Sequence, residues 1–147
     1  MIERTYDILG IHKFVTQPHV WRHAADDTCP RPSLYFPKID DRNIWLSVDG
    51  NRALFYLVDL GDRTWEVHVS LAKDAYGNAV RFSRRAMSWF EQNICKGATF
   101  IANVERTHYA IVRVLKAMGF EYLGPWCIPI TRNGQQIARD SYIYREQ

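Results

Sequence analysis

The sequence predicts an α/β (α+β) domain with a mixed, mostly antiparallel sheet, a central parallel β-α-β unit and flanking helices. Three predicted strands follow one another with tight turns between them, as antiparallel strands do, and the third, at residues 64–71, alternates apolar with polar residues. Farther along, a short apolar strand lies between two segments whose apolar residues recur at helical spacing. A strand, a crossover helix and a second strand form a right-handed parallel unit, which would be embedded in this sheet.

The N-terminal segment is expected to be helical and then irregular. Apolar residues recur at roughly helical spacing between residues 6 and 26, which predicts two short helices, and Pro18 would open the second. The next segment, residues 29–42, contains three prolines and the acidic pair Asp40-Asp41. It therefore reads as a surface loop.

Strands are expected to follow in a hairpin arrangement. Asp49-Gly50 is a strong short hairpin signal, and Gly61-Asp62 marks a second turn. The predicted strands around these turns cover residues 43–48, 52–59 and 64–71.

Two helices should flank one more strand. The first helix has apolar residues from Val80 to Ile94 at helical spacing and ends at Lys96-Gly97. The strand is Thr99–Val104. We expect Thr107 to cap the second helix and Gly119 to close it. The final strands are expected at residues 120–130 and 137–144, joined through Asn133-Gly134.

Length and composition favour one soluble domain spanning residues 1–147. Hydrophobic residues make up 47% of the chain, and no run approaches the roughly 18 apolar residues of a membrane span. The N-terminus has no signal-peptide core, so we expect a cytoplasmic protein. A net charge of +3 is too small and too scattered to indicate specific nucleic-acid binding.

The cysteines indicate neither disulfides nor a metal site. Cys29, Cys95 and Cys127 are odd in number and lack CxxC or CxxH spacing. We expect reduced, mostly buried thiols and no bound metal.

One stretch carries a chemical signal, namely a site for an anion. The strand at Trp65–Val69 leads through a loop containing Gly77 and Ala79 into the first long helix. Gly77 would let a phosphate approach the backbone, and the amino end of the helix would present its free N–H groups.

This segment resembles the GNAT N-acetyltransferase superfamily, whose pyrophosphate loop reads Gln/Arg-x-x-Gly-x-Gly/Ala. The loop aligns with Asp74-Ala75-Tyr76-Gly77-Asn78-Ala79, and the family's closing Leu-Gly-Phe aligns with Met118-Gly119-Phe120. The resemblance implies the GNAT fold and acetyl-CoA as cofactor, with the diphosphate against the backbone amides of residues 75–79. The cofactor-binding residues that it implies are Val67, Val69, Ala75, Tyr76, Gly77, Asn78, Ala79 and Arg81.

A narrower resemblance is to GNAT-like proteins of tailed bacteriophages and prophages. These chains are similar in size and carry segments like Gln17-Pro18-His19-Val20-Trp21, Asp26-Asp27 and Trp65–Val69. Some are acetyltransferases, and others are virion or head-assembly components. The resemblance implies the cytoplasm of a host cell, or a virion, as the protein's location.

The chain departs from the family pattern at three positions. Asp74 stands where the family has Gln or Arg, and His108 replaces the Asn that opens the second helix. Leu115 stands where many members place the Tyr that protonates the leaving thiolate. That acid is therefore not available from this position.

Candidate catalytic residues come from two places. Acyl transfer from a thioester requires a base for the amine's proton, a polarised carbonyl and an acid for the sulfur. Glu66 and His68 lie at i and i+2 of one strand and point to one face, so either could be the base, directly or through a water. Tyr109 and His108 are the candidate acids. The alternatives are a core or edge histidine at 68, a cross-strand ion pair of Glu66 and simple packing of Tyr109.

Two hypotheses of function follow. The first is an acetyl-CoA-dependent N-acyltransferase of phage or prophage type, whose partners are a coenzyme A thioester and an amine acceptor that the sequence does not specify. The second is a catalytically degenerate GNAT-like virion or head-assembly protein, whose partners are phage structural proteins. In either case the strands at residues 65–71 and 99–104 should run parallel and splay apart at their carboxyl ends.

Overall fold

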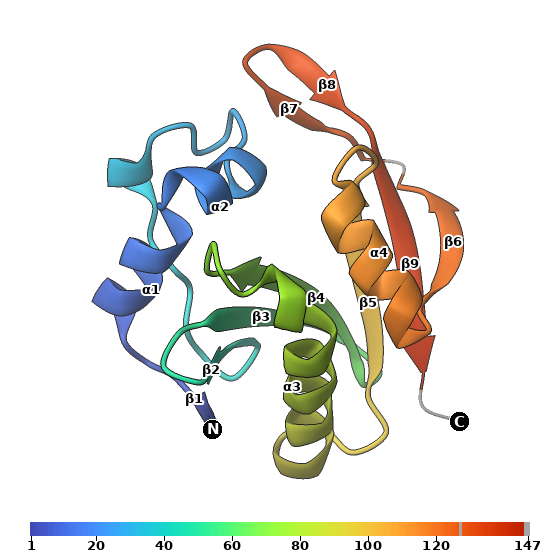
Figure 1. Cartoon of the computed structure of the whole chain (residues 1–147). Coiled ribbons are helices and arrows are strands. Elements are labelled where there is room, and N and C mark those ends of the chain that lie inside the picture. The colour runs from blue at the N-terminus through green and yellow to red at the C-terminus, as the bar shows by residue number, and fades with distance from the viewer. Residues whose placement is uncertain (127, 146–147) are drawn as a thin grey trace.

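A computed structural model describes residues 1–126 and 128–145 of the chain (Figure 1). Its helices and strands are β1 (Ile2–Arg4), α1 (Ile8–Val15), α2 (Pro18–Ala24), η1 (Pro32–Leu34), β2 (Asn43–Val48), β3 (Ala53–Gly61), β4 (Thr64–Leu71), η2 (Tyr76–Asn78), α3 (Ala79–Asn93), β5 (Thr99–Glu105), α4 (Tyr109–Met118), β6 (Glu121–Pro125), β7 (Ile130–Arg132), β8 (Gln135–Ile137) and β9 (Arg139–Arg145).

The main sheet has seven strands in the order β1-β2-β3-β4-β5-β9-β6. Its central pair, β4 and β5, is parallel, and its other neighbouring pairs are antiparallel. The helix α3 connects the parallel pair, as the right-handed crossover rule requires. The predicted fold class is confirmed, and β2 and β4 have the predicted bounds.

The parallel strands separate soon after they meet. The pairing between β4 and β5 joins Thr64–Glu66 to Thr99–Ile101 and no farther along the described strands. Each strand then continues along its other neighbour, β4 beside β3 and β5 beside β9. The predicted splay is therefore confirmed, and it opens a gap in the middle of the sheet.

Helices cover both faces of the sheet (Figure 1). Along β2 and β3, alternate side chains enter different cores because successive residues of a strand point to opposite faces. On one face, Leu46 and Phe55 pack with Phe82 and Phe90 of α3. On the other face, Trp45 and Leu54 pack with α1 and α2.

Local signals explain several helix ends. The carboxylate of Asp7 accepts a hydrogen bond from the amide of Gly10 at 3.0 Å and so caps α1. Pro18 occupies the first position of α2, where a missing N–H costs nothing. Gly119 ends α4 with a left-handed φ of 92°, which glycine adopts without strain.

Other predictions about the elements were wrong. Thr107 does not cap α4, because the helix begins at Tyr109 and His108 holds the cap position without a side-chain hydrogen bond. Asn133-Gly134 turns a small separate hairpin of β7 and β8, whereas β6 and β9 pair with each other in the main sheet. The three-residue edge strand β1 was not predicted, since so short a run has no readable period.

The cysteines differ in part from the prediction. Cys29 and Cys95 are free thiols and only half-buried, whereas Cys127 lies outside the described residues. Among the described residues there is no cluster of three or more His, Cys, Asp or Glu side chains that could hold a metal ion. None of the described helices is long and apolar enough to cross a membrane.

Candidate active site

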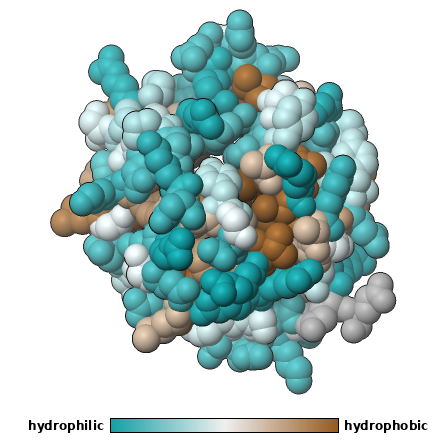
Figure 2. Space-filling view, viewed as in Figure 1, coloured by the Kyte–Doolittle hydropathy of each residue, from teal (hydrophilic) through white to brown (hydrophobic). Residues whose placement is uncertain are grey.

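The gap between β4 and β5 is the mouth of a cleft of about 420 Å³. This volume falls within the roughly 300–1,000 Å³ of small-molecule sites. Side chains from α2, β3, β4, β5 and α4 line it, so it reaches both faces of the sheet. Figure 2 shows hydrophobic residues at the surface near the middle of this view of the molecule, ringed by hydrophilic ones.

At one end of the cleft lie η2, whose Tyr76 lines it, and the amino end of α3. The amide of Ala75 donates to the carbonyl of Ala72 at 3.0 Å, and that of Asn78 donates to Ala75 at 2.9 Å. The amide of Ala79 donates to Tyr76. Because these three amides are already engaged, the expectation that all of residues 75–79 offer theirs is too broad. The amides of Tyr76 and Gly77 precede that of Asn78, the first amide to donate within the turn, and are the ones available to an anion.

The backbone at Gly77 is open. A Cβ at this position would meet nothing within 4 Å. A larger side chain would therefore fit the protein itself and would obstruct only a molecule placed against the turn. The following helix spans fifteen residues, and its dipole adds positive potential there.

The remaining predicted cofactor-binding residues fall into two groups. Val67, Val69 and Tyr76 line the cleft. Ala75 and Ala79 are buried beneath the turn, and Arg81 is exposed above the ring of Phe82 and is not among the lining residues described.

Asp74 is turned outward. Its side chain is 81% exposed, and its carboxylate lies 3.7 Å from Nη2 of Arg52. A carboxylate so solvated and paired repels an anion at the turn only weakly.

On the α2 face, Glu66 and His68 form a pair. Nε2 of His68 lies 2.7 Å from Oε1 of Glu66, so the two side chains share a face as predicted. The His68 ring lines the cleft and stacks on Tyr56 at 5.6 Å. The other oxygen of Glu66 accepts from Nδ2 of Asn103 at 2.5 Å, and Oδ1 of Asn103 accepts from Ser141 at 2.5 Å.

Glu66 is held ionised. Burial raises the pKa of its carboxyl group, but the hydrogen bond and charge of His68, the hydrogen bond of Asn103 and the charge of Arg139 together lower it below the ordinary value. The carboxylate therefore only accepts hydrogen bonds at neutral pH.

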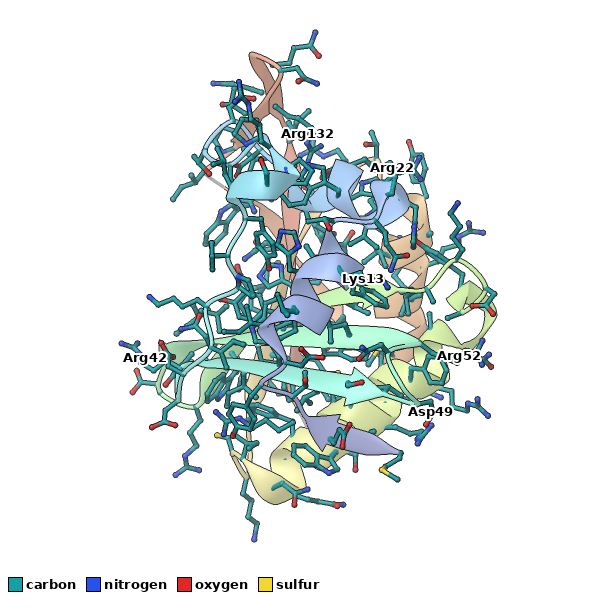
Figure 3. The ribbon with its side chains drawn as sticks, turned by 90° about the vertical axis from the view of Figure 1, so that its left-hand side faces the viewer. Lys13, Arg22, Arg42, Asp49, Arg52 and Arg132 are labelled. Atoms are coloured by element: carbon teal, nitrogen blue, oxygen red, sulfur yellow. The ribbon has the colours of Figure 1, made fainter. Side chains whose placement is uncertain are left out.

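A second polar group lies farther along β5. Nδ1 of His23 is 3.4 Å from Glu105, whose other oxygen lies 2.7 Å from Nη2 of Arg132. Arg132 comes from the β7–β8 hairpin and donates to the carbonyls of Ala25 and His23, so it joins this hairpin to the end of α2 (Figure 3). The ring of His108 stacks on His23 at 3.8 Å.

The candidate acids do not fit that role at neutral pH. Burial, followed by the charge of His23, lowers the pKa of His108 to about 4, so at neutral pH the ring is uncharged and lacks the acidic proton of an imidazolium. The side chain of Tyr109 is 68% exposed and is not among the described residues of the cleft wall. Leu115 does line the cleft but has no proton to transfer.

The sequence did not point to the residues that complete the site. Asn103 meets Glu66 only because β5 lies beside β4, and Ser141 meets Asn103 only because β5 pairs with β9. The contact of Glu105 with His23 and Arg132 joins three distant segments. No spacing within one segment encodes these contacts. The only available signal was the presence of polar residues in otherwise apolar strands.

Comparisons with known proteins define the class of fold. No protein-family model matches the sequence. No curated protein matches it either. Solved structures do match, and the fold is that of the GNAT acetyltransferases.

Three of these structures illustrate the likeness. A spermidine N-acetyltransferase from Vibrio cholerae, in complex with CoA and spermine, matches with a TM-score of 0.76 and 14% identity over 99% of this chain and 94% of its own. YncA from Salmonella typhimurium, with its cofactor acetyl-CoA, matches with a TM-score of 0.72 and 14% identity over 99% and 92%. A GNAT-family acetyltransferase from Bacillus anthracis matches with a TM-score of 0.57 and 14% identity over 71% and 66%.

Proposed function

We propose that the protein is an acetyl-CoA-dependent N-acyltransferase. One observation carries the proposal, namely a cleft lined both by Tyr76, next to the open backbone at Gly77, and by His68, which pairs with the carboxylate of Glu66. The spermidine acetyltransferase and YncA, which share this fold, were crystallised with CoA and acetyl-CoA.

Acetyl-CoA would enter from the α3 side. Its diphosphate would lie against the amides of Tyr76 and Gly77, where the dipole of α3 favours negative charge. Its thioester would lie between the parted strands, along the apolar side chains of Val67 and Val69. Beyond Glu66, backbone amides of β4 have no partner on β5, so one of them can donate to the thioester carbonyl.

The acceptor amine would enter from the α2 side. Its nitrogen attacks the thioester carbon, and its proton passes to the Glu66–His68 pair, directly or through a water. The C–S bond then breaks, and the thiolate of coenzyme A leaves. A thiol ionises near pH 8.5, so its thiolate is a fair leaving group and can take its proton from water. Leu115 in place of an acid therefore slows this step without preventing it.

Two narrower statements stay predictions. The amine acceptor could be a polyamine, as for the neighbour crystallised with spermine, or another amine. The phage or prophage type rests on the sequence resemblance alone, and so does the location in a host cell that this type implies. Since the structural neighbours are acetyltransferases, an enzyme is favoured over a virion component.

Binding of the donor is tested by thermal unfolding with acetyl-CoA. A ligand at a hundred times its dissociation constant stabilises the native protein by about 2.7 kcal/mol, which raises Tm by several degrees. Gly77→Val should fold normally, because its side chain meets open space, and should lose at least about tenfold in affinity. Gly77→Ala should lose less. An unchanged dissociation constant in Gly77→Val would exclude this site for the diphosphate.

Catalysis is tested without an acceptor. Hydrolysis of acetyl-CoA, followed through the released thiol, uses water in place of the amine. His68→Ala and Glu66→Ala should each slow turnover by about 10²- to 10⁴-fold, the usual contribution of a general base. Equal rates in the wild type and both variants would contradict a catalytic role for the pair.

A further inference from the structure

We propose that Nδ1 of His68 is the atom that accepts the proton of the amine, and that Ser141 and Asn103 are positioning residues that hold Glu66 behind it. This inference rests on the proposed function and deepens it. It assigns separate tasks to the two residues of the pair and adds two residues from other strands.

The donor and acceptor of each hydrogen bond from Ser141 to His68 follow from the ionised state of Glu66. An ionised carboxylate only accepts, so Asn103 must turn its Nδ2 toward Oε2. That orientation leaves Oδ1 of Asn103 facing Ser141, whose hydroxyl must then donate. The same reasoning places a proton on Nε2 of His68, which donates to Oε1.

Both carboxylate oxygens of Glu66 are thereby engaged, and Glu66 orients the ring of His68. One of its oxygens is held by His68 and the other by Asn103. To act as the base it would have to give up one of these bonds in a site where its side chain is only 22% exposed. His68 is 42% exposed and lines the cleft, and the hydrogen bonds of the described residues engage only its Nε2. A neutral ring with the proton on Nε2 carries its lone pair on Nδ1.

Asn103 lies where the strand pairing ends. Backbone pairing between β4 and β5 stops at Glu66 and Ile101, and the side chain of Asn103, two residues on, spans the widening gap to Glu66. Asn103 and Ser141 are directly opposite each other on β5 and β9. They are 8% and 5% exposed, so water does not readily replace either contact. The chain of bonds therefore fixes Glu66, and through it the His68 ring, across three strands.

The proton balance is simple. As the amine nitrogen bonds to the thioester carbon and the C–S bond breaks, the proton from nitrogen moves to Nδ1. The imidazolium that forms keeps its Nε2–H bond to the Glu66 carboxylate, whose negative charge stabilises it. The proton then passes from Nδ1 to water at the cleft mouth.

Kinetics of acetyl-CoA hydrolysis provide the first test. Misplacing a catalytic group by about 1 Å costs up to about 100-fold in rate, so Asn103→Leu should lower kcat by about 100-fold and Ser141→Ala by about tenfold, with KM changed by less than about twofold. Ser141→Thr, which keeps the hydroxyl, should restore most of the loss. Ser47→Ala is the matched control, because the buried Ser47 on β2 makes the same hydroxyl-to-amide bond, at 2.5 Å to Asn51. It should keep the wild-type kcat. A kcat in Asn103→Leu equal to that in Ser47→Ala would overturn the positioning role.

The ring protonation state provides a test that does not depend on turnover. In a long-range ¹H–¹⁵N spectrum of the ¹⁵N-labelled protein, His68 should show its proton on Nε2, and in Asn103→Leu it should show mixed tautomers. A proton on Nδ1 in the wild type would overturn the assignment of the base. The thermal shift with acetyl-CoA distinguishes failure of the proposed function from failure of this inference. A protein that binds no acetyl-CoA overturns the proposed function. One that binds it and shows the Nε2–H ring, yet never turns over, overturns the role of His68 as base.

Discussion

Lowering the pH should destabilise this protein through His108. Burial, then the charge of His23, lowers the pKa of His108 to about 4 from an ordinary 6.5, and Arg22 adds to this while Glu105 opposes it. The unfolded chain thus binds more protons between these two values, so stability falls as the pH drops through that window. The full effect corresponds to about 3 kcal/mol, and the part lost between pH 7 and pH 5 to about 2 kcal/mol. Because the ring is partly accessible to solvent, these figures are upper limits.

The assay is urea unfolding of the wild type and His108→Phe across this pH range, followed by tryptophan fluorescence. A phenyl ring keeps the stacking surface for His23 but does not titrate. The wild type should lose up to about 2 kcal/mol more than the variant between pH 7 and pH 5. Between pH 7 and pH 8 the difference between the two proteins should stay constant, which is the internal control. Parallel curves to within about 0.5 kcal/mol down to pH 5 would refute the reasoning from desolvation.

Three further changes test other parts of the structure. Asp74→Arg should tighten acetyl-CoA binding by about three- to tenfold at low salt, with the gain shrinking as salt is added, because it replaces a weakly repelling carboxylate beside the proposed diphosphate site with a positive charge; titration calorimetry at two salt concentrations measures this. Asp27→Ala removes the carboxylate that accepts the amides of Asn133 and Gly134, so these amides should exchange with deuterium at least about tenfold faster, while unchanged exchange would show that the turn holds itself. Phe90→Ala empties a fully buried site and should cost about 3–5 kcal/mol in urea unfolding, and a loss below about 1 kcal/mol would mean that the core refills.

Much of the fold could be predicted from the sequence because its signals are local. The turns at Asp49-Gly50 and Gly61-Asp62 separate β2, β3 and β4, residues 64–71 alternate as a strand does, and Gly119 ends α4 where its position indicates. Predictions failed where a local signal was compatible with more than one pairing of strands. Asn133-Gly134 is a hairpin signal, but no local pattern says which two strands it joins, and here it joins the short β7 and β8.

The residues of the candidate site likewise differ in whether a local signal reveals them. Glu66 and His68 were found because residues two apart on one strand share a face. Asn103 and Ser141 were not, because they reach Glu66 through the pairing of strands that are distant in sequence. His108 was considered as an acid from its place at the head of a helix, and its burial against His23 lowers its pKa, which no pattern in the sequence indicates.

The short pairing of β4 with β5 divides the sheet into two plates that three residue pairs join. One plate consists of β1 to β4 and is built from residues 2–71, and the other consists of β5, β9 and β6 and is built from residues 99–145. We expect three residue pairs to resist bending less than a full-length ladder, so that the angle between the plates would depend on what fills the wedge between them. A thioester with a longer acyl chain would widen that angle and shift Asn103, which spans the wedge, relative to Glu66. Under the proposed function, the length of the donor's acyl group would then change the placement of Glu66 and His68 on the α2 face of the sheet.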